Sequence, residues 1–170
     1  APGALVFYTS ANVDATDNGG EGAWAERMRI ASSGIVTKSN LHPAFSAVSS
    51  TAGGQGLAGV QIFATVTNNQ GSHYNASNGK FTAPVNGVYH FAGQILSTAG
   101  NYIRCDFQLN GTSIRWGENT HVPSGGSQTN YAYSGLGLTI VLAANDYINL
   151  HSGYTNYGSG YSFFSGHLVG

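Results

Sequence analysis

A short aromatic stretch constrains the fold of this chain more than any other feature. Tyr89 and Phe91 stand two residues apart just after Gly87, and Phe81 precedes them by one turn. Side chains two residues apart on a β-strand project from the same face. We therefore predict a strand that begins at Gly87 and buries Tyr89 and Phe91, with Phe81 closing over them.

Strand-like runs recur along the rest of the chain, separated by turns rich in Gly and Asn. The pair Asn110-Gly111 is a strong signal for a two-residue turn between antiparallel strands. Strands at this spacing, without a convincing helix, predict an all-β antiparallel sandwich or barrel. The runs are 44–50, 60–66, 87–96, 101–110, 112–119, 135–142, 146–153 and 161–169.

Alternation predicts which side chains of these strands are buried. In 101–109, Ile103, Cys105 and Phe107 share one face, so the single cysteine is predicted to be a small core residue rather than a nucleophile. In 87–96 and 161–169 both faces carry apolar side chains. A sandwich strand needs only one apolar face. We therefore expect a second burial partner, most simply another subunit.

The first 40 residues differ from the rest of the chain. They hold four of the seven acidic residues and three of the six Lys and Arg residues, around the strand-like runs 3–10 and 26–39. We expect a short strand-rich segment at residues 1–40 and a β-rich head at residues 41–170, with a boundary near 39–43. Because the chain starts with Ala1 rather than Met, we expect it to be a fragment of a longer protein.

Composition excludes several classes of function. Charged residues make up 8% of the chain, against about 25% in an average globular protein. The net charge of −1 argues against nucleic-acid binding, which needs a basic surface. No apolar run approaches the roughly 18 residues of a membrane-spanning helix, so we expect no membrane insertion. Low charge with many small polar and aromatic residues is typical of extracellular or virion β-proteins.

Motifs for catalysis and cofactors are weak. The stretch GQGLAG at 54–59 matches a dinucleotide fingerprint but precedes a strand-like run rather than the required helix. No G-x-S-x-G motif occurs, and the six histidines have no metal-binding spacing. Asp106, Glu118 and Asp146 are the only acids after residue 41. We therefore predict a non-enzymatic protein without cofactor or metal.

The aromatic stretch belongs to a longer pattern. Residues 63–91 follow the spacing F-x5-N-x4-Y-x6-F-x5-G-x-Y-x-F. This resembles the signature of the complement C1q globular head, a jelly roll of the tumour-necrosis-factor-like type. Further pieces resemble the family in order: PAFSAV at 43–48, QLNGTSI at 108–114, LTIVLAANDYINL at 138–150 and YSFFSGHLV at 161–169. The resemblance implies a jelly-roll head over residues 41–170 that forms a homotrimer.

Two family features differ in this chain. The family has an aromatic residue two positions after Phe91, where this sequence has Gly93, so local packing must differ. Some relatives bind calcium, a site that takes about six oxygen ligands. This head is poor in carboxylates, so no calcium site is predicted.

The N-terminal segment resembles a different group of proteins. The sequence ERMRIASSGIV at 26–36 is similar to a segment of bacteriophage tail fibres that precedes a C-terminal head domain. The resemblance implies a virion protein, outside the cell, in which an upstream fibre shaft carries this jelly roll as its tip.

Exposed aromatic residues are the candidates for receptor binding. The stretch HSGYTNYGSGYS at 151–162 places three tyrosines among small polar residues, and a second turn follows Trp116. Rigid amphipathic aromatics suit recognition surfaces, although the same residues could pack between subunits. The candidate residues are Tyr154, Tyr157, Tyr161, Trp116 and Asn119.

Four functions compete at this stage. The first is a receptor-binding tip of a tail fibre, with a bacterial surface glycan or outer-membrane protein as partner. The second is a structural trimerisation cap, and the third is a secreted complement-like head that binds proteins or molecular patterns. A depolymerase has the least support, because no catalytic carboxylate pair is evident.

Overall fold

The computed structural model describes residues 3–10, 24–38, 42–49, 54–56, 58–98, 100, 102–121, 123, 131–158 and 160–169. These residues form strands, turns and irregular segments, and none of them is helical. The chain divides into two compact units, Ala1–His42 and Pro43–Gly170. Each unit is described by itself.

The N-terminal unit contains a three-stranded antiparallel sheet in the order β1-β2-β3, formed by β1 (Leu5–Ser10), β2 (Trp24–Ile30) and β3 (Val36–Lys38). The predicted run 26–39 is therefore two strands with a turn between them. In that turn Ala31 N–H donates to the Ile35 carbonyl over 2.8 Å, and Gly34 adopts a φ of 79°, which glycine accommodates without strain. The acidic residues Asp14, Asp17 and Glu21 lie outside the described residues.

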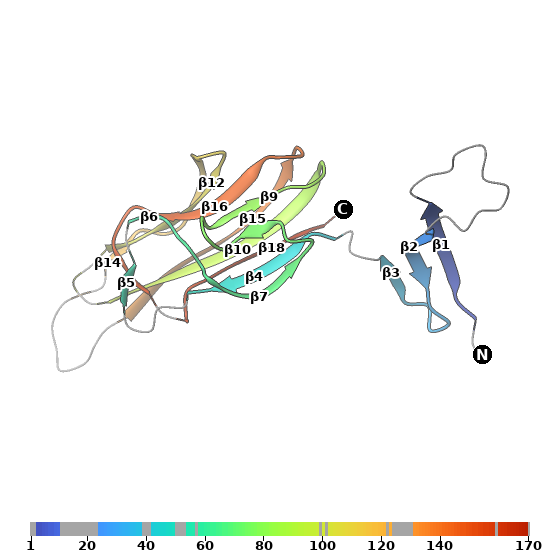
Figure 1. The fold of residues 1–170 in the computed structure, drawn as a ribbon. Helices are drawn as coiled ribbons and strands as arrows, with labels where there is room; N and C mark the ends of the chain where they lie inside the picture. Colours follow the sequence, from blue (N-terminus) through green and yellow to red (C-terminus); the bar gives the residue numbers. More distant parts are fainter. Residues whose placement is uncertain are drawn as a thin grey trace. The chain divides into compact units, whose positions relative to one another are not determined.

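The head unit is a sandwich of two antiparallel sheets (Figure 1). The first sheet has the order β15-β10-β18-β4-β7. The second has the order β13-β12-β16-β9-β8, with β6 paired to β16. The strands of the first are β15 (Tyr131–Leu142), β10 (Gly87–Thr98), β18 (Phe163–Leu168), β4 (Ala44–Val48) and β7 (Thr65–Gln70). Those of the second are β13 (Thr112–Trp116), β12 (Cys105–Leu109), β16 (Tyr147–Ser152), β9 (Lys80–Thr82), β8 (Tyr74–Asn75) and β6 (Gly59–Val60).

Two short ladders complete the head. One pairs β11 (Tyr102–Ile103) with β14 (Thr120–His121), and the other pairs β17 (Asn156–Gly158) with β5 (Gly54–Gly56). The all-β antiparallel sandwich predicted from the sequence is confirmed. The predicted hairpin turn is also confirmed, with positive φ at Asn110 (50°) and Gly111 (86°).

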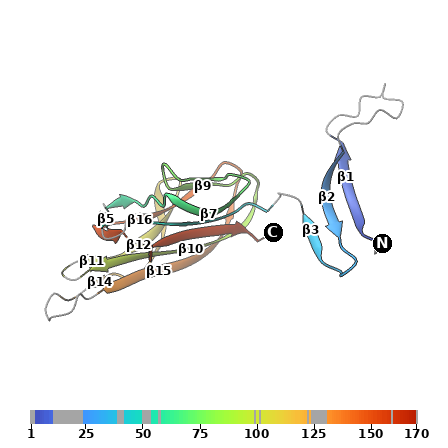
Figure 2. The same ribbon diagram turned by 60° about the horizontal axis from the view of Figure 1, so that its bottom comes forward.

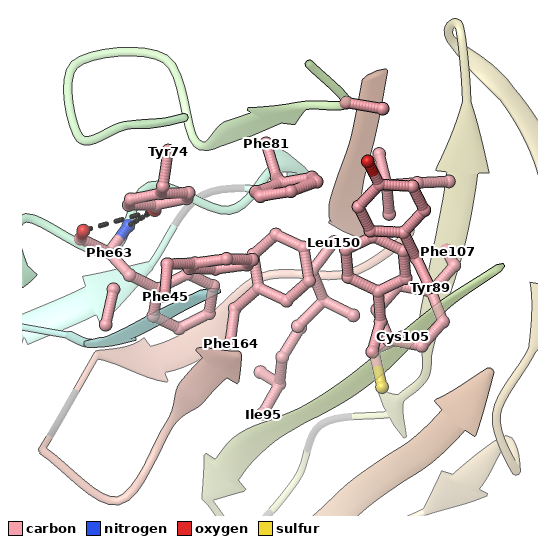
Figure 3. Packing of buried hydrophobic residues seen from close by; sticks show 14 of the residues in the cluster. Phe45, Phe63, Tyr74, Phe81, Tyr89, Ile95, Cys105, Phe107, Leu150 and Phe164 are labelled. Carbon is pink, nitrogen blue, oxygen red and sulfur yellow. Dashed lines mark hydrogen bonds between the residues drawn. The ribbon is translucent and has the colours of Figure 1, made fainter. Parts of the chain in front are cut away.

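The core between the two sheets is built from the predicted aromatic stretch (Figure 3). Tyr89 and Phe91 are fully buried, and the ring of Phe81 lies 5.7 Å and 5.4 Å from theirs. Cys105 is buried as well, which confirms its predicted place in the core. Its burial raises the pKa of the thiol to about 11.

Side chains of the signature also form hydrogen bonds with buried backbone groups. The Tyr74 hydroxyl accepts from Phe63 N–H and donates to the Phe63 carbonyl, each over 3.2 Å, as Figure 3 shows. The Asn69 side chain accepts from Tyr74 N–H and donates to the Tyr74 carbonyl. Buried polar groups of this kind need such partners. The spacing F-x5-N-x4-Y therefore closes a loop over the core.

One predicted strand, the run 60–66, is wrong because of this loop. The run 60–66 was expected to be a strand, but residues 61–64 lie outside any ladder and the strand begins at Thr65. The backbone N–H and carbonyl of Phe63 are hydrogen-bonded to the Tyr74 hydroxyl. Gln61 N–H donates to the Leu150 carbonyl over 2.8 Å. The polar sequence after residue 66, which looked like a turn, forms most of β7 instead.

Packing explains why this chain has Gly93 at the position where the family has an aromatic residue. A Cβ atom at this position would lie 2.8 Å from a methyl carbon of Leu150. Leu150 is fully buried on β16 and occupies the space beside Gly93. The leucine of one sheet therefore fills the space that an aromatic side chain of the other sheet would take.

Candidate functional site

The head has two distinct ends. Hydrogen bonds from Leu168 N–H to the Pro43 carbonyl and from Val169 N–H to the Val88 carbonyl hold both termini of the unit at one end. Strand β10 starts beside them and runs for 12 residues, which is about 40 Å at 3.3 Å per residue. It ends at the opposite end, among β5, β11, β14 and β17 (Figures 1 and 2). We call this end, with residues 102, 119–121, 131–133, 154–158, 160 and 161, the distal tip.

One aromatic cluster at the distal tip contains Tyr154. Its ring lies 5.8 Å from that of Tyr102, which lies 4.7 Å from the ring of His121. Tyr102 and His121 face each other in the β11–β14 ladder. The Ser152 hydroxyl donates to the Tyr154 carbonyl over 2.8 Å and accepts from Tyr154 N–H. The half-buried Tyr154 is therefore held in place beside two exposed rings.

A second cluster contains Tyr157, whose ring lies 5.6 Å from that of Tyr131. Tyr157 belongs to β17, where it pairs with Gln55. The neighbouring Asn156 is buried, and its side-chain amide donates to Gln61 Oε1 over 2.8 Å. The three tyrosines of 151–162, grouped by sequence as one candidate stretch, therefore do not lie on one continuous loop. Residues 151–152 end β16 and 156–158 form a strand, because the Asn156 amide and the β5 ladder hold this backbone.

The other three candidates are exposed at or near the same end. Tyr161 is 68% exposed and its carbonyl accepts from the Gln94 side chain. Trp116 is 57% exposed at the end of β13, where no ring contact within the described residues joins it to the tyrosines. Asn119 is exposed and follows Glu118, whose carbonyl accepts from the Ser134 hydroxyl over 3.0 Å. The structure thus brings Tyr154 and Tyr157 into clusters and leaves Trp116 apart.

Sequence reasoning missed several aromatic residues of the distal tip. Tyr131 and Tyr133 are about half exposed and lie on β15, which starts four residues earlier than the predicted run at 135. The alternation of Tyr131 and Tyr133 with the small residues Ala132 and Ser134 was the sequence signal that could have extended this strand to residue 131. Tyr102 was not among the candidate residues, because nothing in the sequence paired it with His121.

A polar cluster on the second sheet involves the most buried of the acids that the structure describes. Asp106 is 1% exposed. One of its carboxylate oxygens lies 3.2 Å from His151 Nδ1, and the other accepts from the Ser113 hydroxyl. In a nucleophilic triad the histidine stands between serine and carboxylate. Here the carboxylate stands between the other two, so the cluster does not activate Ser113.

The remaining acids have unrelated partners. Asp146 accepts from the Asn110 amide over 2.8 Å and from Ala143 N–H over 2.9 Å, and these hydrogen bonds lower the pKa of its carboxyl. The described part of the chain contains no group of three or more His, Cys, Asp and Glu side chains that could hold a metal ion. It also contains no helix long and apolar enough to cross a membrane.

Several solved structures share this fold. The globular domain of zebrafish complement 1qA aligns with a TM-score of 0.58 and 16% identity, covering 75% of this chain and 98% of that one. Murine APRIL, crystallised at pH 5.0, aligns with a TM-score of 0.57 and 14% identity, covering 75% of this chain and 99% of that one. The Eiger TNF of S. frugiperda gives 0.55 and 11%, with coverages of 76% and 93%. No curated protein matches the chain.

The comparison with family models agrees with these structural matches. The model of the C1q domain matches residues 44–169, which is nearly the whole head unit. Domains of this kind are typically trimeric, non-enzymatic binding modules that act outside cells. With the sandwich topology and the signature core in place, the chain belongs to the C1q domain family.

Proposed function

We propose that this chain is the trimeric tip of a bacteriophage tail fibre and that it binds a receptor on the surface of the host bacterium. The receptor would be a surface glycan or an outer-membrane protein. The observation that carries the proposal is the gathering of exposed aromatic side chains at the distal tip, at the end of the head opposite its termini.

The distal tip has the chemistry of a recognition surface. Tyrosine offers a large, rigid apolar ring with a hydrogen-bonding hydroxyl, and little conformational entropy is lost when it binds. The two clusters around Tyr102 and Tyr131 hold partly exposed rings of this type in fixed relative positions. Pre-ordered rings bind without a large ordering cost.

The first sheet supports the proposed trimer. Its strands β4, β7, β10, β15 and β18 contain no Asp, Glu, Lys or Arg. The outer face, turned away from the core, carries apolar side chains such as Val141 and Val169, which are 73% and 57% exposed in the single chain. Burying charge without a partner is costly, so an uncharged apolar face is suited to burial between copies. The second sheet carries Lys80 and the exposed Arg115 and suits solvent.

Trimerisation would multiply the strength of weak contacts. Each trimer presents three distal tips on one rigid head, so contacts that are weak singly add through avidity when receptor spacing allows it. This arrangement fits a fibre that first touches a cell reversibly. Reversible binding of this kind needs no catalytic group. The cluster of Asp106 with Ser113 and His151 is not arranged as a nucleophilic triad.

The phage assignment rests on the N-terminal unit. Its segment from Glu26 to Val36 resembles tail-fibre sequences, and it forms a small sheet of its own, β1-β2-β3. Such a unit fits a connection between an upstream fibre shaft and the head. The protein would then be part of the virion and would act outside the bacterial cell.

The direct test replaces two tip tyrosines and measures adsorption. We expect the double variant Tyr154→Ala with Tyr157→Ala to remain trimeric by light scattering and to adsorb less to a panel of bacterial strains that bind the native chain. A matched control is Tyr147→Ala, whose ring lies 4.0 Å from the Lys80 ammonium, on the second sheet away from the distal tip. This control should adsorb like the native chain.

The other outcomes reassign the residues. If the double variant loses the trimer, the tyrosines belong to the subunit interface. If it stays trimeric and adsorbs normally, the tip clusters are not the site. Binding of the native trimer to no bacterial strain would favour the structural cap. Release of reducing sugar from host polysaccharide that depends on Asp106, Glu118 or Asp146 would contradict a non-enzymatic role.

A further inference from the structure

Two histidines face each other on the outer face of the first sheet. His90 on β10 and His167 on β18 are directly opposite in the antiparallel register. Their ring centroids are 5.7 Å apart with a tilt of 51°. The two residues are far apart in the sequence, so only the strand pairing brings them together.

A neighbouring strand fixes the orientation of one ring. His90 Nδ1 lies 3.0 Å from the Thr139 hydroxyl, and Thr139 is the partner of His90 in the β10–β15 register. When Nδ1–H donates to the hydroxyl, Nε2 of His90 carries the free lone pair. A hydrogen bond of this kind is the usual support of a histidine that binds a metal ion.

The surroundings make the pair chemically distinct. Among the side chains of the five strands in this sheet, the two histidines are the only ionisable groups besides tyrosines. Val88 and Ala92 flank His90 along β10, and Val141 lies next to Thr139 on this side of β15. No carboxylate or cation of these strands competes for the imidazoles.

The distance suits a shared ion. With metal–nitrogen bonds of about 2.1 Å, two imidazoles that share a tetrahedral ion have ring centroids roughly 5 Å apart. The observed 5.7 Å therefore needs only a small rotation of the side chains. Imidazole nitrogens favour zinc, copper and nickel over calcium or magnesium.

We propose that His90 and His167 bind a divalent transition-metal ion of the zinc class, and that ligand groups of a neighbouring copy complete its coordination. A closed zinc site takes four ligands, whereas one chain supplies two here. The completion by other copies rests on the proposed trimer, in which the uncharged outer face of this sheet is buried. The ion would hold the copies together at a face that otherwise has only apolar and small polar contacts.

The test uses the full chain freed of metal with EDTA and titrated with ZnCl₂ by calorimetry. We expect saturable binding that is lost in His90→Gln and in His167→Ala. His167 is exposed in the single chain, so its removal leaves the core intact. Thr139→Val should weaken zinc binding about 10-fold to 100-fold, as the loss of such a supporting group does elsewhere. His121→Ala, which removes an exposed histidine of the distal tip, is the matched control and should bind zinc like the native chain.

Two further readouts separate this proposal from the trimer itself. Co²⁺ bound in place of zinc should give the visible absorption of a tetrahedral nitrogen site, absent in both histidine variants. Light scattering of the EDTA-treated chain reports the trimer without metal. A trimer that binds no zinc, or binds it equally well in His167→Ala, would overturn the metal site and leave the proposed function standing. Zinc bound by a chain that stays monomeric would overturn the completion by neighbouring copies.

Discussion

Replacing Gly166 with alanine should disrupt the core beside β18, between its neighbours β10 and β4 in the first sheet. Gly166 lies on β18, and a Cβ atom there would be 2.3 Å from Cδ1 of Phe91 and 2.9 Å from Cε1 of Phe45. Carbon atoms in contact are normally about 3.5–4.0 Å apart. The ring of Phe91 would therefore have to move by more than an ångström.

The ring has little room to move. Phe91 is fully buried, and the rings of Phe81, Phe107 and Phe164 lie 5.4 Å, 6.2 Å and 6.1 Å from it. Overpacking of a dense core costs roughly 1–3 kcal/mol, occasionally more. Because the nearest ring is itself held on several sides, we expect a loss near the top of that range, about 3 kcal/mol. For a chain of this size that corresponds to a fall in Tm of roughly 6–12 °C.

Urea and thermal unfolding at one fixed protein concentration measure this effect without a change in any assembly equilibrium. The control is Gly160→Ala, because a Cβ atom there meets nothing within 4 Å and surface changes usually stay within about 0.5 kcal/mol. The double variant Gly166→Ala with Phe91→Leu should lose less than the sum of the single losses, since the smaller side chain leaves room for the new methyl group. If Gly166→Ala is as stable as Gly160→Ala, the described packing of Phe91 against β18 is wrong.

Three further predictions concern single groups of the head. Tyr74→Phe leaves the buried N–H and carbonyl of Phe63 without their partner and should cost about 1–3 kcal/mol in urea unfolding; an unchanged midpoint would exclude the loop closure. Cys105 is fully buried and its thiol pKa is raised to about 11, so a bulky thiol reagent at pH 8 should label the chain in denaturant and leave the native chain unlabelled, whereas rapid native labelling would place the sulfur at the surface. Hydrogen bonds from Asn110 and Ala143 lower the pKa of the Asp146 carboxyl, so its stabilisation is present above the unfolded-state pKa of about 4 and is lost as the pH falls through the lower folded-state pKa. The stability gap between the native chain and Asp146→Ala should therefore close in acid, and a gap that stays constant down to pH 2 would contradict it.

The core could be predicted from the sequence because its signal is local. Tyr89 and Phe91 were placed in the core by their spacing after Gly87, and Cys105 by sharing a strand face with Ile103 and Phe107. The turn at Asn110-Gly111 was equally readable, since few residues other than glycine and asparagine adopt its positive φ values. These features need no knowledge of which strands are neighbours.

Features that depend on strand neighbours could not be predicted in the same way. The start of β7 at Thr65 follows from the Tyr74 hydroxyl taking the backbone groups of Phe63, a long-range contact invisible to periodicity. The clusters of Tyr154 with Tyr102 and of Tyr157 with Tyr131 arise from separate ladders meeting at one end of the sandwich. The roles of these tyrosines in binding remain a prediction.

The mass of the assembled chain tests most directly whether the uncharged face of the first sheet is buried between three copies. Light scattering at micromolar concentration should give three times the chain mass of 17.6 kDa. Val141→Glu, which places a charge on that face at a residue 73% exposed in the single chain, should lower the mass. Val60→Glu, on strand β6 of the second sheet, should leave it unchanged. A native chain that is monomeric, or a Val141→Glu variant that stays fully trimeric, would contradict the proposed assembly.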